Sequence, residues 1–194
     1  TGDVSFERLG DWLHQEDFFL LHFPDAVPWL TRLREDFREH PVGLLGTVRC
    51  RRWRLGGDAL LLGDAAHAIV PFHGQGMNAA FEDCLEMDAC LRETGDGWTD
   101  AFRSYFQRRK PNADAIADMA IENYREMRSS VIDPRFLLRK ELAFELERRQ
   151  PDRFIPRYSM VMFRDDISYS EARRRGENQL RILDEVITGK TCLS

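Results

Sequence analysis

The chain has 194 residues and a formal net charge of −5, with 43% hydrophobic and 31% charged residues, which is typical of a soluble globular protein and argues against a general nucleic-acid-binding surface. No apolar run approaches the roughly 18 residues of a transmembrane span, and the short polar segment 188–194 predicts no membrane anchor. The four cysteines form no C-x-x-C pair, so we expect reduced thiols and a cytoplasmic location.

The first third of the chain is predicted to contain two helices and a short β portion. Pro24 ends the first hydrophobic periodicity, and Pro41 limits the second. Aliphatic and β-branched runs then indicate strands, and the last of them is expected to be buried. In chain order these elements are a helix over 4–22, a helix over 26–39, a strand over 44–50, a short strand over 53–55 and a buried strand over 59–62.

The rest of the chain is predicted to be almost entirely helical. Met77, Phe81 and Leu85 fall at four-residue steps, and Pro111 marks a kink or a new start. We expect helices over 75–91, 98–129, 135–149 and 170–187, with 151–163 extended or irregular. The fold class is therefore mixed α and β, a short β portion followed by a helical cap. We expect three regions: helices and strands over 1–58, a strand ending in Gly-Asp with its loop and helix over 59–110, and the helical cap over 111–194.

The segment Leu60–Asn78 is the most informative in the chain. Its apolar run ends in Gly63-Asp64, and Gly74 and Gly76 precede a predicted helix. Asp can accept hydrogen bonds from sugar hydroxyls, while glycines and a helix N-terminus allow close approach of an anion. The pattern favours a cofactor that bears a polyol and phosphate. A simple helix N-cap is the alternative role for Asp64.

Four segments carry a resemblance to a known family. They are Ile69–Asn78, Glu122–Met127, Arg153–Met160 and Tyr169–Gly176. With Gly63-Asp64, the first resembles the second FAD-binding motif of the flavin-dependent aromatic hydroxylases. All four in this order resemble the branch of that family that acts on L-kynurenine, over about residues 5–187. The resemblance implies the C-terminal part of the flavin hydroxylase fold.

The resemblance also assigns residues to the cofactor. It places Asp64 near the ribityl or phosphate-linked portion of FAD, and the backbone of Met77 and Asn78 near the polar edge of the flavin ring. The complete set that it implies for FAD is Asp64, Pro71, Gly74, Gly76, Met77 and Asn78. His67 lies on the turn that follows Gly63-Asp64, and we expect it to have a structural role.

A second set is implied for the substrate: Phe72, His73, Asn123, Glu126, Met127 and Tyr158. Asn123, Glu126 and Met127 share one helix face by their spacing, although a polar stripe on an amphipathic helix would have the same pattern. No residue is assigned a certain catalytic role. His73 is the one candidate for proton transfer, with a hydrogen-bonded loop histidine as the alternative. The spacing of the histidines predicts no metal site.

The resemblance implies FAD and NADPH as cofactors and O₂ as co-substrate, with L-kynurenine hydroxylated to 3-hydroxykynurenine through a flavin C4a-hydroperoxide. Such enzymes begin with a strand–Gly-x-Gly-x-x-Gly–helix unit for the ADP part of FAD, which is absent here because Ala79 stands where the third glycine would be. We therefore expect an N-terminal FAD-binding segment to be missing. Two alternatives stay open: a related hydroxylase with another aromatic substrate, and a non-catalytic fragment or split-protein half.

Overall fold

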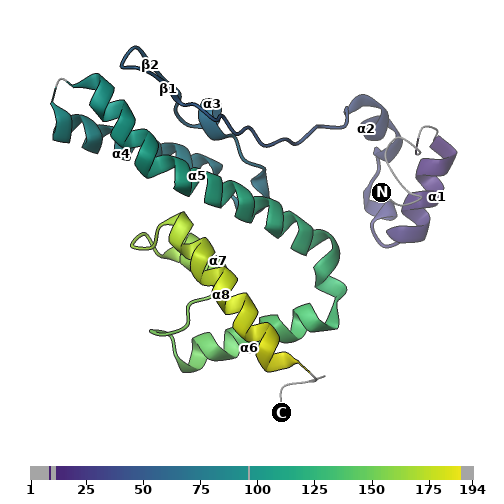
Figure 1. Ribbon diagram of the computed structural model, residues 1–194. Coiled ribbons are helices and arrows are strands. Elements are labelled where there is room, and N and C mark those ends of the chain that lie inside the picture. The colour runs from purple at the N-terminus through teal and green to yellow at the C-terminus, as the bar shows by residue number, and fades with distance from the viewer. Residues whose placement is uncertain (1–8, 10–11, 96, 189–194) are drawn as a thin grey trace. The chain divides into compact units, whose positions relative to one another are not determined.

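The computed structural model describes residue 9 and residues 12–95 and 97–188 (Figure 1). Packing divides the chain into two units, Thr1–Leu45 and Gly46–Ser194, which are described separately. The domain boundaries expected from the sequence stay a prediction. The start of the first expected helix and Cys192 lie outside the described residues.

The described elements are mostly helices. In chain order they are α1 Trp12–His22, η1 Val27–Trp29, α2 Leu33–Glu39, β1 Arg54–Leu55, β2 Ala59–Leu60, α3 Asp64–His67, η2 Pro71–His73, α4 Gly76–Thr94, α5 Trp98–Ser129, η3 Ser130–Ile132, α6 Pro134–Arg149, α7 Arg157–Phe163 and α8 Tyr169–Ile187. In the second unit α4 lies along α5, and α8 packs against α5, α6 and α7 (Figure 1). The four long helices expected from periodicity are confirmed, and α5 continues through Pro111.

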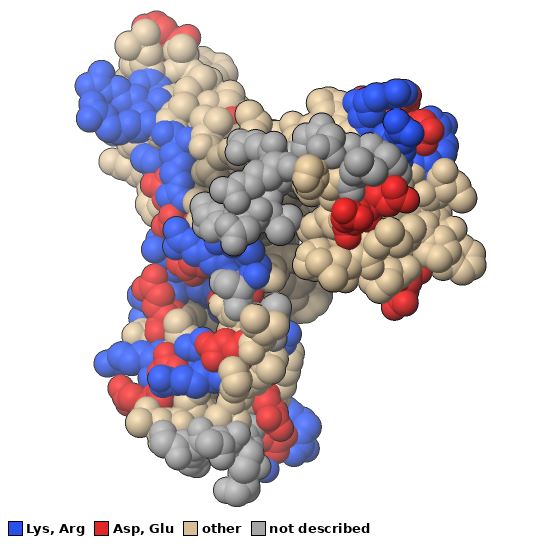
Figure 2. Space-filling model, turned by 90° about the vertical axis from the view of Figure 1, so that its right-hand side faces the viewer, with Lys and Arg blue, Asp and Glu red and all other residues tan. Residues whose placement is uncertain are grey.

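Ion pairs cover much of the helical surface. Some join residues one turn apart, as in Arg175–Glu171 at 2.6 Å, and others join helices, as in Arg139–Asp184 at 3.0 Å. Basic and acidic atoms are interleaved on the face shown in Figure 2. In the basic run Arg173-Arg-Arg175 each of the three arginines pairs with a glutamate.

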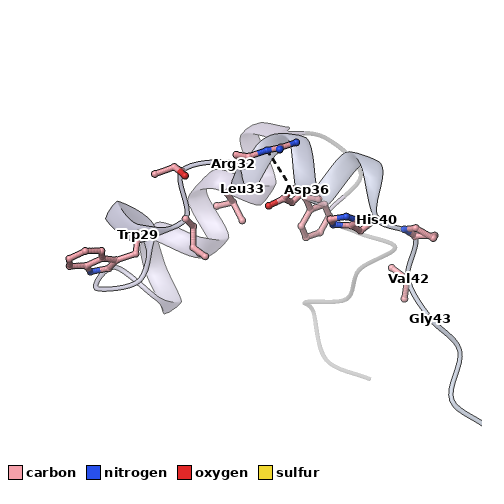
Figure 3. Close-up of a pocket in the computed structure, with 11 residues that line it drawn as sticks. Trp29, Arg32, Leu33, Asp36, His40, Val42 and Gly43 are labelled. Atoms are coloured by element: carbon pink, nitrogen blue, oxygen red, sulfur yellow. Dashed lines mark ion pairs between the residues drawn. The ribbon is translucent and has the colours of Figure 1, made fainter.

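The first unit is built around aromatic side chains. The rings of Phe18 and Phe19 meet edge to face at 5.4 Å, and Phe19 meets Phe37 at 6.3 Å. The single helix expected over 26–39 is wrong: η1, which contains a proline, is separated from α2 by a turn. Figure 3 shows a pocket of about 620 Å³ between residues 29 and 43, which contains none of the predicted site residues.

The β portion is smaller than expected. β1 and β2 pair antiparallel around a turn in which Gly56 has a φ of +55°, a value that favours glycine. The strand expected over 44–50 is not formed. Instead, the N–H groups of Val48 and Cys50 donate to the carbonyls of Ala68 and Ala66, at 2.8 and 3.0 Å, so this segment pairs with the end of α3 rather than with a strand.

The buried strand expected over 59–62 is also wrong. β2 covers only two residues, and Leu61 and Leu62 are 38% and 37% exposed. β1 pairs with one edge of β2, and no further strand pairs with the other edge among the residues described. The apolar run therefore lies at an open sheet edge, the kind of surface that proteins usually cover.

The segment 151–163, which was expected to be extended or irregular, contains a helix instead. α7 begins after Pro156, whose φ of −54° and ψ of 147° suit the residue before a helix. Met160 and Val161 in α7 are buried, so tertiary packing supplies the stabilisation that local sequence did not reveal.

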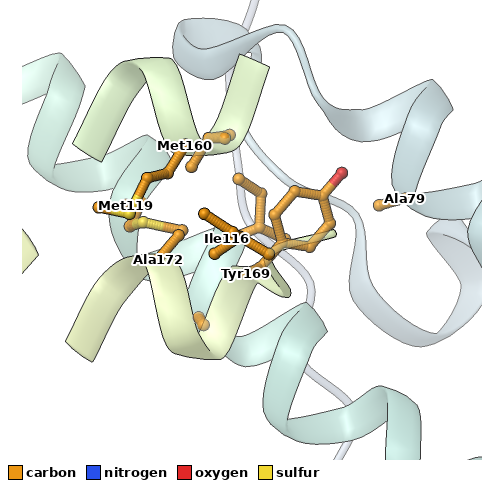
Figure 4. Packing of buried hydrophobic residues seen from close by; sticks show 9 residues of the cluster. Ala79, Ile116, Met119, Met160, Tyr169 and Ala172 are labelled. Carbon is orange, nitrogen blue, oxygen red and sulfur yellow. The ribbon is translucent and has the colours of Figure 1, made fainter. Parts of the chain in front are cut away.

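Two buried clusters meet along α5. One joins the residue before β1 to α3, α4 and the first half of α5, and comprises Trp53, Ala66, Met87, Cys90, Ala101, Phe102, Tyr105 and Ala113. The other joins α4 to the middle of α5, α7 and α8, and comprises Ala79, Ala115, Ile116, Met119, Met160, Val161, Ile167, Tyr169 and Ala172 (Figure 4). One long helix thus supplies a wall of both clusters.

The second cluster generates a stability prediction. Ile116 is fully buried, so Ile116→Ala should lower the free energy of unfolding by about 2–5 kcal/mol through lost burial and a residual cavity. Urea unfolding followed by circular dichroism measures this. Ile182→Ala is the matched control, because Ile182 is 52% exposed on α8. Equal stability losses in the two variants would contradict the assignment of the core.

Candidate functional site

Asp64 directly follows a glycine whose φ angle is positive. Gly63 has a φ of +56° and occupies the N-cap position of α3, and Asp64 is the first residue of the helix, with an exposed side chain. Asp64 is therefore not the helix N-cap, and that alternative is wrong. Its carboxylate is available to accept hydrogen bonds from a ligand.

A buried aspartate fixes this turn. Asp83 on α4 is fully buried; its Oδ2 accepts from the Gly63 N–H at 2.9 Å and lies 2.6 Å from His67 Nε2, while Arg109 Nε donates to Oδ1 at 2.8 Å. Burial by itself raises the pKa of the Asp83 carboxyl, but the hydrogen bonds from His67, Gly63 and Arg109 outweigh burial and lower it to about 2. Asp83 is therefore a charged, fully hydrogen-bonded anchor.

The polar network continues from Arg109 to the start of α4. Arg109 Nη1 donates to Glu82 at 2.9 Å, and the Tyr169 hydroxyl donates to the other Glu82 oxygen at 2.7 Å. Gln75 Oε1 lies 3.2 Å from the same hydroxyl, whose one proton is shared between Glu82 and Gln75, and it accepts from Asn78 Nδ2 at 2.9 Å. Hydrogen bonds thus connect the Gly-Asp turn to the glycine loop. A cavity of about 790 Å³ opens beside this network and is lined partly by it.

The glycine loop leads into the N-terminus of α4. Gly74 has a φ of +67° and open space where a side chain would be, and Gly76 is the first residue of the helix. The first turn contains no acidic residue, and the first N–H groups of a helix have no intrahelical partner. Met77 and Asn78 are exposed here. This end of α4 can therefore donate to an electron-rich group.

Four of the predicted substrate residues are brought together directly before this loop. The Asn123 amide on α5 donates to the carbonyl of Phe72, and the Phe72 ring lies 4.6 Å from that of Tyr124. His73 stacks on Tyr158 of α7, with ring centroids 5.6 Å apart and an interplanar angle of 16°. Segments more than 80 residues apart in sequence thus converge on one face of the second unit.

The remaining two predicted residues lie on the same stretch of α5. Glu126 pairs with Arg157 at 3.2 Å, so its carboxylate is held by a neighbour. Met127 is 57% exposed, and its sulfur lies 3.9 Å from the Asn123 amide nitrogen. Glu126 and Met127 therefore lie on one stretch of α5, as their spacing predicted, but in different environments: the first is ion-paired and the second is exposed.

His73 is buried, and its Nδ1 has no hydrogen-bond partner among the described residues. Burial lowers the pKa of the ring; a backbone hydrogen bond opposes this in part, and the positive charge of Arg157 adds a smaller lowering effect. The ring is therefore neutral at neutral pH, with one nitrogen free to accept or donate a hydrogen bond.

Sequence reasoning missed the residues that hold this site in place: Gln75, Asp83, Arg109 and Arg157. Asp83 gave a signal, since an acidic residue lies at four-residue steps between Ala79 and Met87, both of which are buried. A carboxylate in the middle of an apolar helix face needs buried partners. Among the described residues, no group of three His, Cys, Asp or Glu side chains is placed to bind a metal, and no helix has the length and apolarity to cross a bilayer.

The Asp83 hydrogen bonds predict acid-dependent stability. The pKa of Asp83 is depressed from 3.8 to about 2 in the folded state, so its contribution of about 2 kcal/mol is present above pH 4 and lost as the pH falls towards 2. Denaturant unfolding at several pH values between 2 and 6 measures it. Asp83→Asn should be less stable at pH 6 and show a shallower loss towards pH 2. Parallel pH profiles for the two proteins would contradict the assignment.

Comparison with known proteins shows which proteins the chain resembles. Residues 33–120 match the FAD binding domain family. The chain is 50% identical over 192 residues to the kynurenine 3-monooxygenase of Stenotrophomonas maltophilia (strain K279a), covering 99% of this chain and 42% of the relative. It is 51% identical over 196 residues to the protein of the same name from Xanthomonas euvesicatoria pv. vesicatoria (strain 85-10), covering 100% and 42%.

A third relative of that name, from Xanthomonas axonopodis pv. citri (strain 306), is 50% identical over 198 residues. The chain spans 42% of the length of each of these curated relatives. The family match and the relatives agree on the class of protein. Over nearly its whole length the chain is therefore similar to kynurenine 3-monooxygenases, and residues 33–120 match an FAD binding domain.

Proposed function

We propose that this chain supplies the second FAD-binding motif and part of the substrate site for the NADPH-dependent hydroxylation of L-kynurenine. The observation that carries the proposal is the convergence of Phe72, His73, Asn123 and Tyr158 beside the N-terminus of α4. The names of the relatives favour L-kynurenine over other aromatic substrates.

The residues present fit FAD. Asp64 is exposed and free to accept hydrogen bonds from ribityl or sugar hydroxyls, and Gly74 leaves open space where any other residue would place a side chain. The N–H groups at the start of α4, around Met77 and Asn78, can donate to the electron-rich edge of a flavin ring. Pro71 and Gly76 shape the loop between these points. When bound, FAD supplies the redox chemistry that activates O₂ with electrons from NADPH.

The chain's own contribution to the reaction is to bind and orient the substrate. L-kynurenine carries a carboxylate, an ammonium group and an aromatic amine. Because the Asn123 amide nitrogen is already bonded to the Phe72 carbonyl, its Oδ1 is the atom left to accept from an amine. The Tyr158 hydroxyl and the neutral His73 ring add polar atoms to the same face.

Three further residues shape that face. The Phe72 ring and the exposed Met127 side chain offer apolar contact to an aromatic ring, and the ion pair of Glu126 with Arg157 favours an orienting role for this carboxylate over direct pairing with the ammonium group. His73 is the group that would hold or move a proton, since its Nδ1 is unpaired among the described residues.

Binding of FAD tests the cofactor part of the proposal. Asp64→Ala should weaken FAD binding by about tenfold or more, because it removes a charged acceptor for ligand hydroxyls. Titration of the chain with FAD, followed by flavin fluorescence and by absorbance after desalting, measures this. Asp58→Ala is the matched control, since Asp58 is also exposed on a glycine turn. Equal affinities in both variants would rule out the assigned role of Asp64.

Substrate binding is tested at Asn123. In a preparation that oxidises NADPH in response to L-kynurenine, Asn123→Ala should raise KM for L-kynurenine about tenfold, the cost of about one hydrogen bond to a charged group. FAD content should change little. A variant that lost FAD to the same degree as substrate affinity would contradict the assignment. A preparation that turns over a hydroxybenzoate in preference to L-kynurenine would favour the alternative substrate class.

A further inference from the structure

One residue of α8 departs from the pattern of a charged surface helix. Gly176 is buried in the middle of the helix, where glycine is unfavourable compared with alanine. A Cβ at this position would lie 2.5, 2.8 and 2.9 Å from Cδ, Cγ and Cβ of Arg157. Only glycine therefore lets α8 approach the Arg157 side chain this closely.

Arg157 is held from a second direction. Its guanidinium pairs with Glu122 at 2.5 Å and with Glu126 at 3.2 Å, two carboxylates one turn apart on α5. Because the stem of the side chain packs on Gly176 and its head pairs with α5, Arg157 links α5, α7 and α8. The Arg157 side chain is only 21% exposed, so these pairs are less screened than those of the open surface.

Gln179 on α8 adds a third contact to the same segment. It lies three residues after Gly176, on the same face of α8, and its amide donates to the carbonyl of Ile155 at 3.0 Å. Residues 155–157 are therefore fixed immediately before Tyr158. The Tyr158 side chain is itself 53% exposed, so its neighbours enclose it only in part and its direction depends on the backbone that carries it.

We propose that Gly176 and Arg157 are positioning residues of the substrate site: the close packing of α8 on the Arg157 stem, together with the pairs to Glu122 and Glu126, holds the Tyr158 ring against His73. The inference rests on the proposed function, because the Tyr158–His73 pair is a substrate-facing element only if the chain binds L-kynurenine there. The sequence predicts no site residue on α8. Through Gly176, this helix would nevertheless help to set the geometry of the site.

The Gly176→Ala variant separates this role from simple helix stability. Helix propensity alone predicts a more stable helix with alanine. Close packing predicts that the Arg157 stem must move, because the contacts include its Cβ, which cannot shift without the backbone. Arg157→Met is the second variant, since it keeps an unbranched stem over Gly176 and removes the charge.

The measurement is nuclear magnetic resonance of the His73 ring in the chain labelled at histidine, without FAD or substrate. In the unmodified chain the stacked Tyr158 ring should shift the His73 signals, and the pKa of His73 should lie below its ordinary value of 6.5. Both variants should lose the ring-current shift, and Gly176→Ala, which keeps the charge of Arg157, should also raise the pKa of His73 towards its ordinary value. Asn178→Ala, at an exposed position of α8, should change neither.

Unchanged His73 signals in a folded Gly176→Ala or Arg157→Met chain would overturn the proposal. If Gly176→Ala does not fold, Arg157→Met decides alone. Addition of L-kynurenine then tests the proposed function separately from the positioning contact. If the variants behave as expected but L-kynurenine leaves the His73 signals of the unmodified chain in place, the proposed function fails while the positioning contact stands.

Discussion

The carboxylate of Asp83 is the point on which the arrangement of the second unit depends. It is fully buried and charged, a state that is costly unless every oxygen is satisfied. Its partners come from three places in the chain: the Gly63 turn, the His67 ring of α3 and the Arg109 guanidinium of α5. Since losing any one of them leaves a buried charge short of a partner, the three elements are held in one geometry.

Helix α5 connects this buried carboxylate to both parts of the candidate site, the cofactor part and the substrate part. Arg109 near the middle of this helix joins the cofactor network, and Asn123 further along the same helix bonds to the loop that carries Phe72 and His73. The hydrogen bonds from Glu82 through Tyr169 to Gln75 connect α4 and α8 in the same way. Cofactor residues on loops are thus supported by side chains on long helices, which suits a site that must be preorganised.

The sequence predicted those features that depend on local pattern. Helices α4, α5, α6 and α8 follow from spacing, with Pro134 at the start of α6, and the loop of Gly74 and Gly76 was placed correctly before α4. The short helix α3 that begins at Asp64 was not predicted. The strand over 44–50 and the burial of 59–62 were wrong, because a strand needs a partner that its own residues do not specify. α7 was missed because its helix depends on the burial of Met160 and Val161.

The least predictable features were the long-range polar pairs. The apolar repeat on α4 lies on its exposed side, with Met77 and Leu85 at 69% and 72%, while the buried face carries Asp83. In the sequence, Arg157 and Gly176 belong to two separate motif segments, and only the structure shows that their contact joins α7 to α8. No spacing rule along the chain predicts which arginine meets which carboxylate, since such pairs are set by tertiary packing.

The most direct test of this account is whether Asp83 couples the Gly-Asp turn to the glycine loop. Amide chemical shifts of the chain would be compared before and after Asp83→Asn, a change that keeps the shape of the side chain and removes its charge. The account predicts that the amides of Gly63 and of residues 74–78 shift together, because the network from Arg109 to Gln75 joins them. A change confined to Gly63 and His67, with the glycine loop unaltered, would contradict it.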